Sequence, residues 1–364
     1  MIWGVIAALA IYFGANVYLF MRLWQAIGEL PMPCRALFAV VFCLLSVALF
    51  VAIAARNLPL GEVVHRTLFT VGSWWMVFLL YMVLATAILD IVHVILPQMQ
   101  HGVWYALGVT TLLLIAGNIN YHHPRIENLK IETDKPLVEE LRIVAVSDVH
   151  LGYGTSRKAL ARYVDMINEQ QPDVVLIVGD LIDNSIRPVE EAHMEEELKR
   201  ISAPKGVYMA MGNHEYISGI DACSEFIQRT PICLLRDSVV RVDDGIAIIG
   251  RDDRTNMRRK SVEELADSVA NSYFTVVIDH QPYDIAESEK CGVDLHISGH
   301  THRGQVWPIS WLTDAMYDQS HGYRKWSSTH AYVLQGLSLW GPPFRIGTNS
   351  DMLLVDVKRK NEAD

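Results

Sequence analysis

Hydrophobic residues are concentrated in the first third of the chain, where they form four long runs. These runs span residues 2–21, 36–55, 67–89 and 102–117. A helix needs roughly 20 apolar residues to cross a bilayer; the fourth run is shorter than that and contains Thr110 and Thr111. The pattern predicts an all-α transmembrane bundle of four helices within residues 1–119, in which the fourth span is marginal in length.

The pattern changes downstream of residue 119. A polar linker over residues 120–140 leads into short apolar runs that alternate with amphipathic stretches up to residue 357, and residues 358–364 form a polar tail. The predicted strands are residues 143–147, 174–178, 207–211, 246–249, 274–278, 295–298, 332–334 and 352–357. The predicted helices are residues 158–169, 189–201, 220–228, 261–269 and 285–290. This alternation predicts an α/β domain over residues 141–357, with its functional site at the carboxyl ends of strands.

Charge is distributed as unevenly as hydropathy. Residues 1–119 contain four Arg, no Lys, two Glu and one Asp, which leaves 27 basic and 38 acidic residues in the rest of the chain. Binding to a phosphate backbone needs clustered cations, so this acidic balance argues against nucleic acid as the main partner. The five cysteines are scattered without a CxxC pair, which favours reduced structural thiols.

The basic residues near the apolar runs predict the orientation in the membrane. With four spans, the N-terminus, the second connector and the C-terminal domain share one side, which carries Arg56, Arg66, Arg125, Lys130, Lys135 and Arg142. The opposite side carries Arg22 and Arg35. Because basic residues favour the cytoplasmic side, we expect a multi-pass protein of the bacterial inner membrane with a cytoplasmic C-terminal domain. Loss of the fourth span would reverse this orientation.

Three polar residues lie within or beside the apolar runs. Asp90 and His93 are one helical turn apart at the end of the third run. They either form a proton or ion site or mark the helix reaching the headgroups, which is the commoner situation. Asn16 in the first run is expected to bond a neighbouring helix rather than a ligand.

Five short polar patches follow strand-like runs in the C-terminal half. They are Asp148-Val149-His150, Gly179-Asp180-Leu181-Ile182-Asp183, Gly212-Asn213-His214-Glu215, Asp279-His280 and Gly299-His300-Thr301-His302. Their carboxylate, amide and imidazole groups are numerous enough for two metal ions and one spare acid. A metal pair activates water for attack on phosphate esters, so hydrolysis of such an ester is the favoured chemistry.

The spacing within the patches also suits metal binding. Residues two apart on an extended segment point the same way, as Asp148 and His150 would, and Gly179 lets the backbone turn sharply beside Asp180. One such patch arises by chance, and a single histidine at a strand end is more often a core residue than a ligand. Five patches at strand ends in one order favour the metal site over core packing.

These patches resemble the five motifs of the calcineurin-like metallophosphoesterases over about residues 141–357. The resemblance implies a double β-sandwich flanked by helices, with two divalent metal ions in its cleft. It implies that the first metal is held by Asp148, His150 and His302, and the second by Asn213, His280 and His300, with Asp180 bridging both. It also implies that His214 contacts the scissile phosphate. Mixed nitrogen and oxygen ligands suit Mn, Zn or Fe about equally.

A closer resemblance is to the membrane-tethered bacterial branch of this family, based on Gly299–Gln305 and on Gly341-Pro342-Pro343-Phe344-Arg345. Some members of that branch cleave the pyrophosphate of an acylated UDP-glucosamine. Arg303 stands where glycine is usual and is a candidate substrate contact, as is Arg345, for which an ordinary salt bridge is an equal alternative.

Two further features leave alternatives open. Asp183 either orients a metal-bound histidine or caps the following helix. Trp307, Trp311, Trp326 and Trp340 could form an acyl-chain groove or a membrane-facing rim, and core packing explains them as well.

Together these features predict a membrane-anchored phosphohydrolase acting on a phosphodiester or pyrophosphate at the bilayer, such as a phospholipid or a lipid-linked nucleotide. The alternative is a transmembrane sensor or assembly module whose phosphoesterase domain acts on a soluble nucleotide or phosphoprotein.

Overall fold

The computed structural model describes residues 2–55, 61–97, 102–137, 139–243, 245–270 and 272–360. Arg56, which contributed to the predicted orientation, and the end of the predicted tail lie outside these residues. The chain divides into two units. A helical unit contains residues 1–119 and 341–346, and an α/β unit contains residues 120–340 and 347–364.

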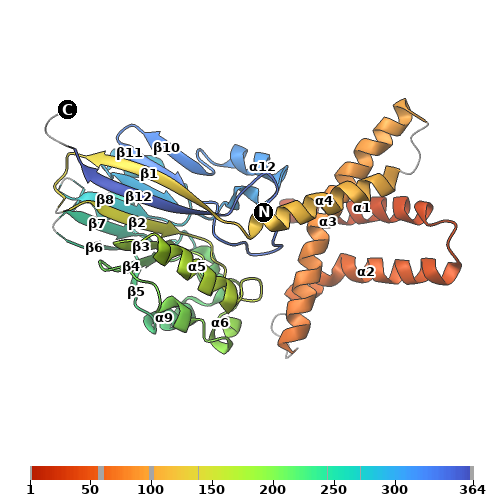
Figure 1. Cartoon of the computed structure of the whole chain (residues 1–364), viewed down its shortest axis with the longest axis horizontal. Helices are drawn as coiled ribbons and strands as arrows, with labels where there is room; N and C mark the ends of the chain where they lie inside the picture. Colours follow the sequence, from red (N-terminus) through yellow and green to blue (C-terminus); the bar gives the residue numbers. More distant parts are fainter. Residues whose placement is uncertain are drawn as a thin grey trace. The chain divides into compact units, whose positions relative to one another are not determined.

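The helical unit contains all four predicted apolar helices (Figure 1). They are α1 (Ile2–Ala26), α2 (Met32–Ala54), α3 (Glu62–Ile95) and α4 (Gly102–Tyr121). Each is long and apolar enough to cross a membrane, and the fourth is longer than the sequence pattern predicted. The architecture is therefore that of a membrane protein.

Polar side chains connect the helices to one another. Nε1 of Trp75 on α3 donates a hydrogen bond of 3.0 Å to Oδ1 of Asn16 on α1, which confirms the interhelical role predicted for Asn16. Asp90 on α3 accepts hydrogen bonds from Tyr18 and Arg22 on α1. Asp90 is thus engaged in an ion pair between two helices.

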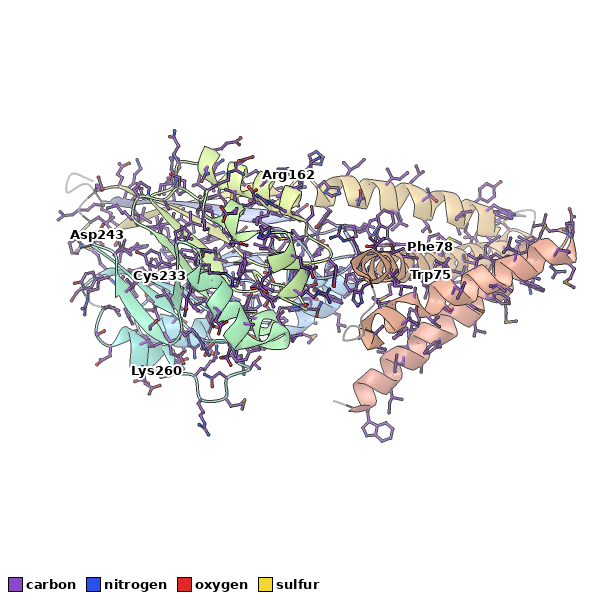
Figure 2. All side chains as sticks on the ribbon, turned by 90° about the horizontal axis from the view of Figure 1, so that it is seen from below. Trp75, Phe78, Arg162, Cys233, Asp243 and Lys260 are labelled. Atoms are coloured by element: carbon purple, nitrogen blue, oxygen red, sulfur yellow. The ribbon has the colours of Figure 1, made fainter. Side chains whose placement is uncertain are left out.

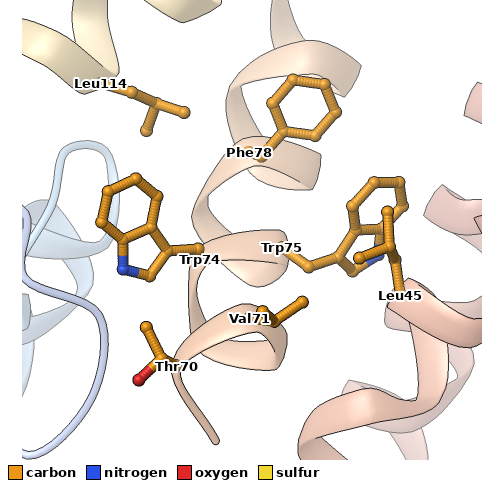
Figure 3. Close-up of a pocket in the computed structure, with 7 residues that line it drawn as sticks. All are labelled: Leu45, Thr70, Val71, Trp74, Trp75, Phe78 and Leu114. Carbon is orange, nitrogen blue, oxygen red and sulfur yellow. The ribbon is translucent and has the colours of Figure 1, made fainter. Parts of the chain in front are cut away.

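A cavity of about 540 Å³ lies among α2, α3 and α4 (Figure 3). Its lining is almost wholly apolar and consists of Leu45, Thr70, Val71, Trp74, Trp75, Phe78 and Leu114. In a bilayer such a cavity is surrounded by acyl chains.

A short segment late in the sequence, Gly341–Ile346, belongs to the helical unit. The ring of Phe344 packs edge-on against Trp74 of α3, with 4.8 Å between centroids. The backbone N–H of Arg345 donates to the carbonyl of Gly117 on α4 at 3.0 Å. A Cβ on Gly117 would lie 2.4 Å from Ile346, so only glycine permits this approach. The predicted domain boundary at residue 119 therefore omits this segment.

The α/β unit is built on two six-stranded sheets. The first has the order β1 (Arg125–Thr133), β12 (Asp351–Arg359), β2 (Leu141–Val146), β3 (Val174–Val178), β4 (Val207–Ala210) and β5 (Ile232–Leu235). The second has the order β10 (Gly322–Trp326), β11 (Thr329–Val333), β9 (Leu295–Ser298), β8 (Phe274–Ile278), β7 (Ile246–Gly250) and β6 (Ser238–Arg241). Strands β2 to β5 are parallel, as are β7, β8, β9 and β11, so their carboxyl ends share an edge.

The core has layers, as the predicted double β-sandwich requires. One apolar cluster contains residues of both sheets, including Leu176 of β3 and Val276 of β8, and so fills the space between them. A second cluster joins the first sheet to α5 (Arg157–Glu169), and a third joins the second sheet to α10 (Val262–Ala266). All five residues of β3 are buried, and each contributes roughly 1.5–3 kcal/mol of burial free energy.

The remaining helices are short. They are α6 (Arg187–Glu191), α7 (Glu195–Leu198), α8 (Asn213–Ser218), α9 (Ile220–Gln228), α11 (Ile285–Lys290), the 3-10 turn η1 (His302–Gly304) and α12 (Ile309–Met316). Figure 2 shows charged side chains such as Arg162, Asp243 and Lys260 on the α/β unit, whereas Trp75 and Phe78 are on α3.

Candidate metal centre

The predicted ligands follow the carboxyl ends of five strands. Asp148 and His150 follow β2, Asp180 follows β3, Asn213 begins α8 just after β4, and His280 follows β8. The fifth strand, β9, is followed by His300 and His302. Because these strands are parallel within each sheet, their polar ends converge.

The backbone at this edge is unusual. Five of the seven predicted ligands have positive φ angles between 47° and 70°, namely Asp148, His150, Asp180, His300 and His302. A non-glycine residue in this region costs about 1–3 kcal/mol and persists only where its surroundings enforce it. Backbone hydrogen bonds from Asp148 to Gly179 and from His150 to Asp180, at 3.1 and 3.0 Å, hold two of the loops together. Such strain is concentrated at functional sites.

One cluster consists of Asp148, His150 and His302, whose ligand atoms lie within 4.8 Å of one another. The two imidazole Nε2 atoms are 3.1 Å apart, and Oδ1 of Asp148 lies 3.4 Å from Nε2 of His302. All three side chains are buried. These are the residues predicted to hold one metal.

A second cluster consists of Asp180, His280 and His300. Oδ2 of Asp180 lies 3.0 Å from Nε2 of His280 and 3.9 Å from Nε2 of His150, so this carboxylate faces both clusters. Nδ1 of His280 lies 2.8 Å from the carbonyl of Val178. A carbonyl can only accept, so Nδ1 carries the proton and Nε2 is left with its lone pair for a metal.

The glycines of the motifs make room for the ligands. A Cβ on Gly212 would lie 2.2 Å from Oδ1 of Asp180, and one on Gly299 would lie 2.5 Å from Oδ2 of Asp148. Either side chain would displace a carboxylate from the site.

The pKa shifts in the first cluster indicate a site that favours positive charge. Burial raises the pKa of Asp148, but His302 and His150 lower it further, so that it falls well below its usual range. Burial opposes protonation of His150, yet Asp148 and Asp183 raise its pKa to about 10. Protons on these imidazoles balance the carboxylates, a role that a metal cation would take over.

In the second cluster, the pKa is raised for only one of the two imidazoles. Burial lowers the pKa of His280, but Asp180 raises it well above its usual range. Burial, followed by the charge on His280, lowers the pKa of His300 to about 4. His300 is therefore neutral at physiological pH, the form that ligates metals.

Buried oxygen atoms without hydrogen bonds give a further reason to expect a metal at this site. Within the described part of the chain, Oδ1 of Asp148 and Oδ1 of Asn213 are buried and accept no hydrogen bond. A buried polar atom without a partner is costly, and a cation would supply one. The donor set of carboxylate, amide and imidazole suits divalent transition metals.

Asp183 and His214 form a third group with His150. Oδ1 of Asp183 lies 3.1 Å from Nδ1 of His214 and 3.5 Å from Nδ1 of His150. The following helix, α6, begins after Ile186 and receives no side-chain cap. The geometry thus favours the ring-orienting role for Asp183 over the capping role.

Glu215 is a buried residue whose role the sequence analysis did not assign. Its carboxylate accepts backbone hydrogen bonds from Asp180, Ile182 and Gly212, at 2.8–3.1 Å, and so joins the loops after β3 and β4. Burial, followed by the charge on Asp180, raises its pKa to about 7. Its position next to His214 was the available signal.

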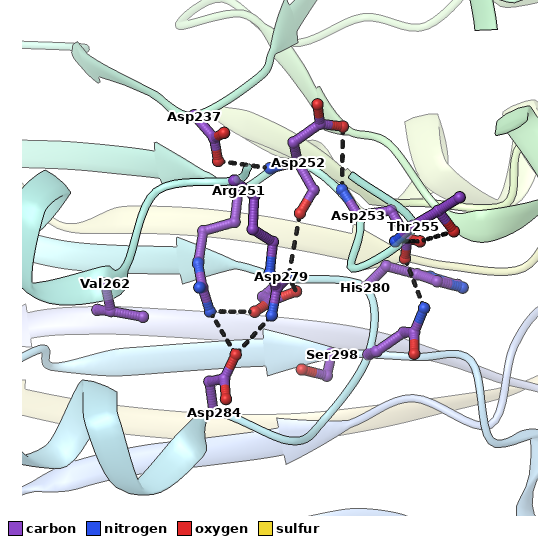
Figure 4. Close-up of polar contacts among 12 residues, drawn as sticks. Asp237, Arg251, Asp252, Asp253, Thr255, Val262, Asp279, His280, Asp284 and Ser298 are labelled. Carbon is purple, nitrogen blue, oxygen red and sulfur yellow. Dashed lines mark hydrogen bonds and ion pairs between the residues drawn. The ribbon is translucent and has the colours of Figure 1, made fainter. Parts of the chain in front are cut away.

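A group of buried charged side chains surrounds Asp279, the residue before His280 (Figure 4). The sequence did not predict this group. Asp279 accepts from Arg251 at 2.7 Å and from Arg259 at 3.0 Å, and both guanidinium groups also contact Asp284. Asp279 is fully buried, and Arg251 is 3% exposed. The two arginines therefore fix the start of the loop that carries His280.

The two predicted substrate contacts lie in different surroundings. Arg303 is partly exposed and directly follows His302 in the turn η1. Arg345 is 1% exposed and belongs to the helical unit. Substrate contact by either residue remains a prediction.

The predicted metal ligands of the α/β domain all lie within residues 148–302. A family model for calcineurin-like phosphoesterases matches residues 141–304. The chain is 32% identical over 246 residues to an uncharacterized metallophosphoesterase of Helicobacter pylori, covering 66% of this chain and 65% of that protein. It is 31% identical over 273 residues to a transmembrane protein with metallophosphoesterase domain of Danio rerio, covering 70% of this chain and 62% of that protein. An uncharacterized metallophosphoesterase of Campylobacter jejuni is 30% identical over 264 residues, covering 70% of this chain and 69% of that protein.

The chain therefore belongs to the calcineurin-like metallophosphoesterase family. The family resemblance inferred from the motifs is confirmed. The chain spans about two thirds of the length of these relatives.

Proposed function

We propose that this protein is a membrane-anchored phosphohydrolase that uses two divalent metal ions to cleave a phosphodiester or pyrophosphate. The observation that carries the proposal is the position of Asp180, whose Oδ2 faces an imidazole of each cluster, at 3.0 and 3.9 Å. A shared carboxylate is what a two-metal site needs. Such an ion pair, when bound, supplies an activated water and neutralises phosphoryl charge.

The protein's own residues complete the chemistry. His214 is close to the clusters but is not needed as a ligand, and its side chain is 13% exposed. Asp183 faces Nδ1 of His214, so Nε2 is the atom that can donate a proton to the leaving oxygen. The contact with Asp183 orients the ring, so that Nε2 is the ring nitrogen directed away from this carboxylate.

We propose that the substrate is lipid-linked. The family domain is attached to four helices suited to a bilayer, and the helical unit contains an apolar cavity of about 540 Å³ lined by Trp74 and Phe78 among others (Figure 3). Both features suit a phosphoester whose acyl chains remain in the membrane. The basic residues at the ends of the spans support a cytoplasmic domain at a bacterial inner membrane.

The sensor alternative rested on Asp90 and His93. Asp90 is paired with Arg22 and Tyr18 of a neighbouring helix, which suits a fixed link between helices. This pairing favours the anchoring role over ion sensing.

The test uses the full chain in lipid nanodiscs, stripped of metal and resupplied with Mn, Zn or Fe. Substrates are a chromogenic phosphodiester and monoester, a soluble nucleotide, and a pyrophosphate-linked lipid. We expect metal-dependent turnover that is fastest on the lipid and absent in Asp180→Ala. Faster turnover of the soluble nucleotide would overturn the lipid substrate, and turnover unaffected by Asp180→Ala would overturn the two-metal site.

A further inference from the structure

The helix α12, just after the last metal-binding motif, has its polar and apolar faces reversed. Ser310 and Thr313, which share one face, are 4% and 9% exposed. The opposite side carries Trp311, Leu312 and Met316, which are 66%, 63% and 63% exposed. A surface helix of a water-soluble domain normally buries its apolar residues and exposes its polar ones.

The reversal extends beyond the helix. Ile309 is 44% exposed, and Trp307 is 39% exposed and packs edge-on against Trp311, with 5.3 Å between ring centroids. A contiguous group of large exposed apolar side chains marks a surface that meets something other than water. We call the residues Trp307, Ile309, Trp311, Leu312 and Met316 the α12 face.

The polar side of α12 packs on the turn η1, which belongs to the last metal-binding motif. A Cβ on Gly304 would lie 2.7 Å from Oγ1 of Thr313 and 2.8 Å from the backbone of Ile309, so glycine allows α12 to approach the turn η1 closely. This turn contains the predicted ligand His302 and the partly exposed Arg303. The α12 face and the turn η1 with its predicted ligand are therefore on opposite sides of one short helix.

The chain itself indicates what covers this face. Four helices suited to a bilayer precede the α/β unit, and only residues 122–124 separate α4 from β1. So short a connection limits how far the start of β1 can lie from the end of α4. Tryptophan is the residue type enriched where protein meets the headgroup layer.

Charge on the strand that follows α12 in sequence also suits a lipid surface. Arg324 and Lys325, on the edge strand β10, are exposed, and the guanidinium of Arg324 lies 4.5 Å from the ring of Trp326. Exposed cations beside apolar side chains attract anionic headgroups. Asp314, the acidic residue of α12, contacts Ser320 and His321.

We propose that the α12 face is a membrane-docking surface that enters the interfacial layer of the bilayer, and that it brings a lipid-borne phosphoester to the adjacent metal centre. The second part of this inference rests on the proposed function, whereas the docking surface does not.

The experiment uses the full chain in nanodiscs of phosphatidylcholine and phosphatidylglycerol, with Cys34, Cys43, Cys233 and Cys291 replaced by serine. An environment-sensitive fluorophore is attached at Leu312→Cys or, as a control, at Met257→Cys, a 92% exposed apolar position in another loop. We expect the label at position 312 to be quenched by phospholipid with a nitroxide on its acyl chain, and the label at position 257 by iodide. A label at position 312 that iodide quenches as well as at position 257 would overturn the proposal. Protection from both quenchers would also overturn it, because it would indicate a protein partner.

A kinetic comparison tests delivery of the substrate. The double variant Trp311→Ser, Leu312→Ser should retain turnover of a soluble chromogenic ester and lose about tenfold or more on a bilayer-borne ester, through a higher KM. Met257→Ser should change neither. Equal loss on both substrates would overturn the delivery role. If the unaltered enzyme cleaves only soluble esters while the label at position 312 remains in lipid, the docking surface stands and the lipid substrate fails.

Discussion

Oδ1 of Asp183 lies 3.1 Å from Nδ1 of His214, so one buried carboxylate sets the orientation of the ring proposed to protonate the leaving group. Replacing Asp183 by asparagine retains its shape and removes its charge. We expect Asp183→Asn to lower kcat by about 10–100-fold, the usual effect of losing such an orienting partner.

Measurement of kcat together with metal content per chain tests this role. His214→Asn is the matched comparison, and the double variant should be little worse than His214→Asn alone because both changes disable the same group. Additive losses in the double variant would contradict a joint role.

The second prediction concerns Gly212. A Cβ at this position would lie 2.2 Å from Oδ1 of Asp180. We expect Gly212→Ala to displace this carboxylate and weaken metal affinity by about 10–100-fold or more. Gly154→Ala is the control, since the nearest heavy atom to its Cβ would be 3.9 Å away. Isothermal titration of the metal-stripped proteins measures the affinities, and equal affinities for both variants would refute the steric argument.

The third prediction concerns the buried ion pairs around Asp279. Asp279→Asn would leave the buried guanidinium groups of Arg251 and Arg259 with one carboxylate between them, Asp284. Breaking a buried ion pair by removing one partner typically costs about 3–5 kcal/mol. Asp284 has a side chain that is 28% exposed, so Asp284→Asn should cost less. Unfolding of both variants in denaturant measures the difference, and a larger loss for Asp284→Asn would contradict the role of burial.

A fourth prediction concerns pH. His296 is buried between Ser288 and Ser298, and burial, aided by the charge of Arg251, lowers its pKa to about 3. An unfolded histidine has a pKa of about 6.5, so between these values the unfolded state binds more protons and stability falls as pH falls.

We therefore expect His296→Gln to flatten this dependence by up to about 1.4 kcal/mol per pH unit. The free energy of unfolding of the metal-free proteins is compared at about pH 7 and about pH 5. The slope is the readout, because the substitution also changes packing at every pH. Parallel slopes for the two proteins would show that His296 does not titrate in this range.

Much of this fold follows from local sequence pattern. Buried strands such as Val174–Val178 and Phe274–Ile278 have the predicted bounds, because a continuous apolar run between polar residues leaves little freedom for their ends. The predicted helix at residues 189–201 is instead the end of α6 followed by α7.

Other features depend on partners distant in sequence. The expected linker contains β1, a strand that is largely exposed and is held by pairing with β12, some 220 residues later. The segment Gly341–Ile346 joins the helices because Phe344 packs on Trp74. Neither pairing leaves a local signal.

The same distinction applies to the site. The seven predicted ligands are brought to one edge because their motifs end strands that run the same way. The ion pair between Arg251 and Asp279 was missed because two opposite charges 28 residues apart have no pattern that identifies them as a buried pair. A membrane-facing rim was only one of several interpretations of Trp307 and Trp311, because the sequence does not show which side chains are exposed.

The central claim is that two metal ions share the carboxylate of Asp180, and one measurement tests it directly. Metal-stripped full-length protein is titrated with Mn(II) while electron paramagnetic resonance records the ions. We predict two ions per chain with the spectrum of an exchange-coupled pair, and in Asp180→Asn a loss of that coupling. One ion per chain, or two uncoupled ions in the unaltered protein, would contradict it.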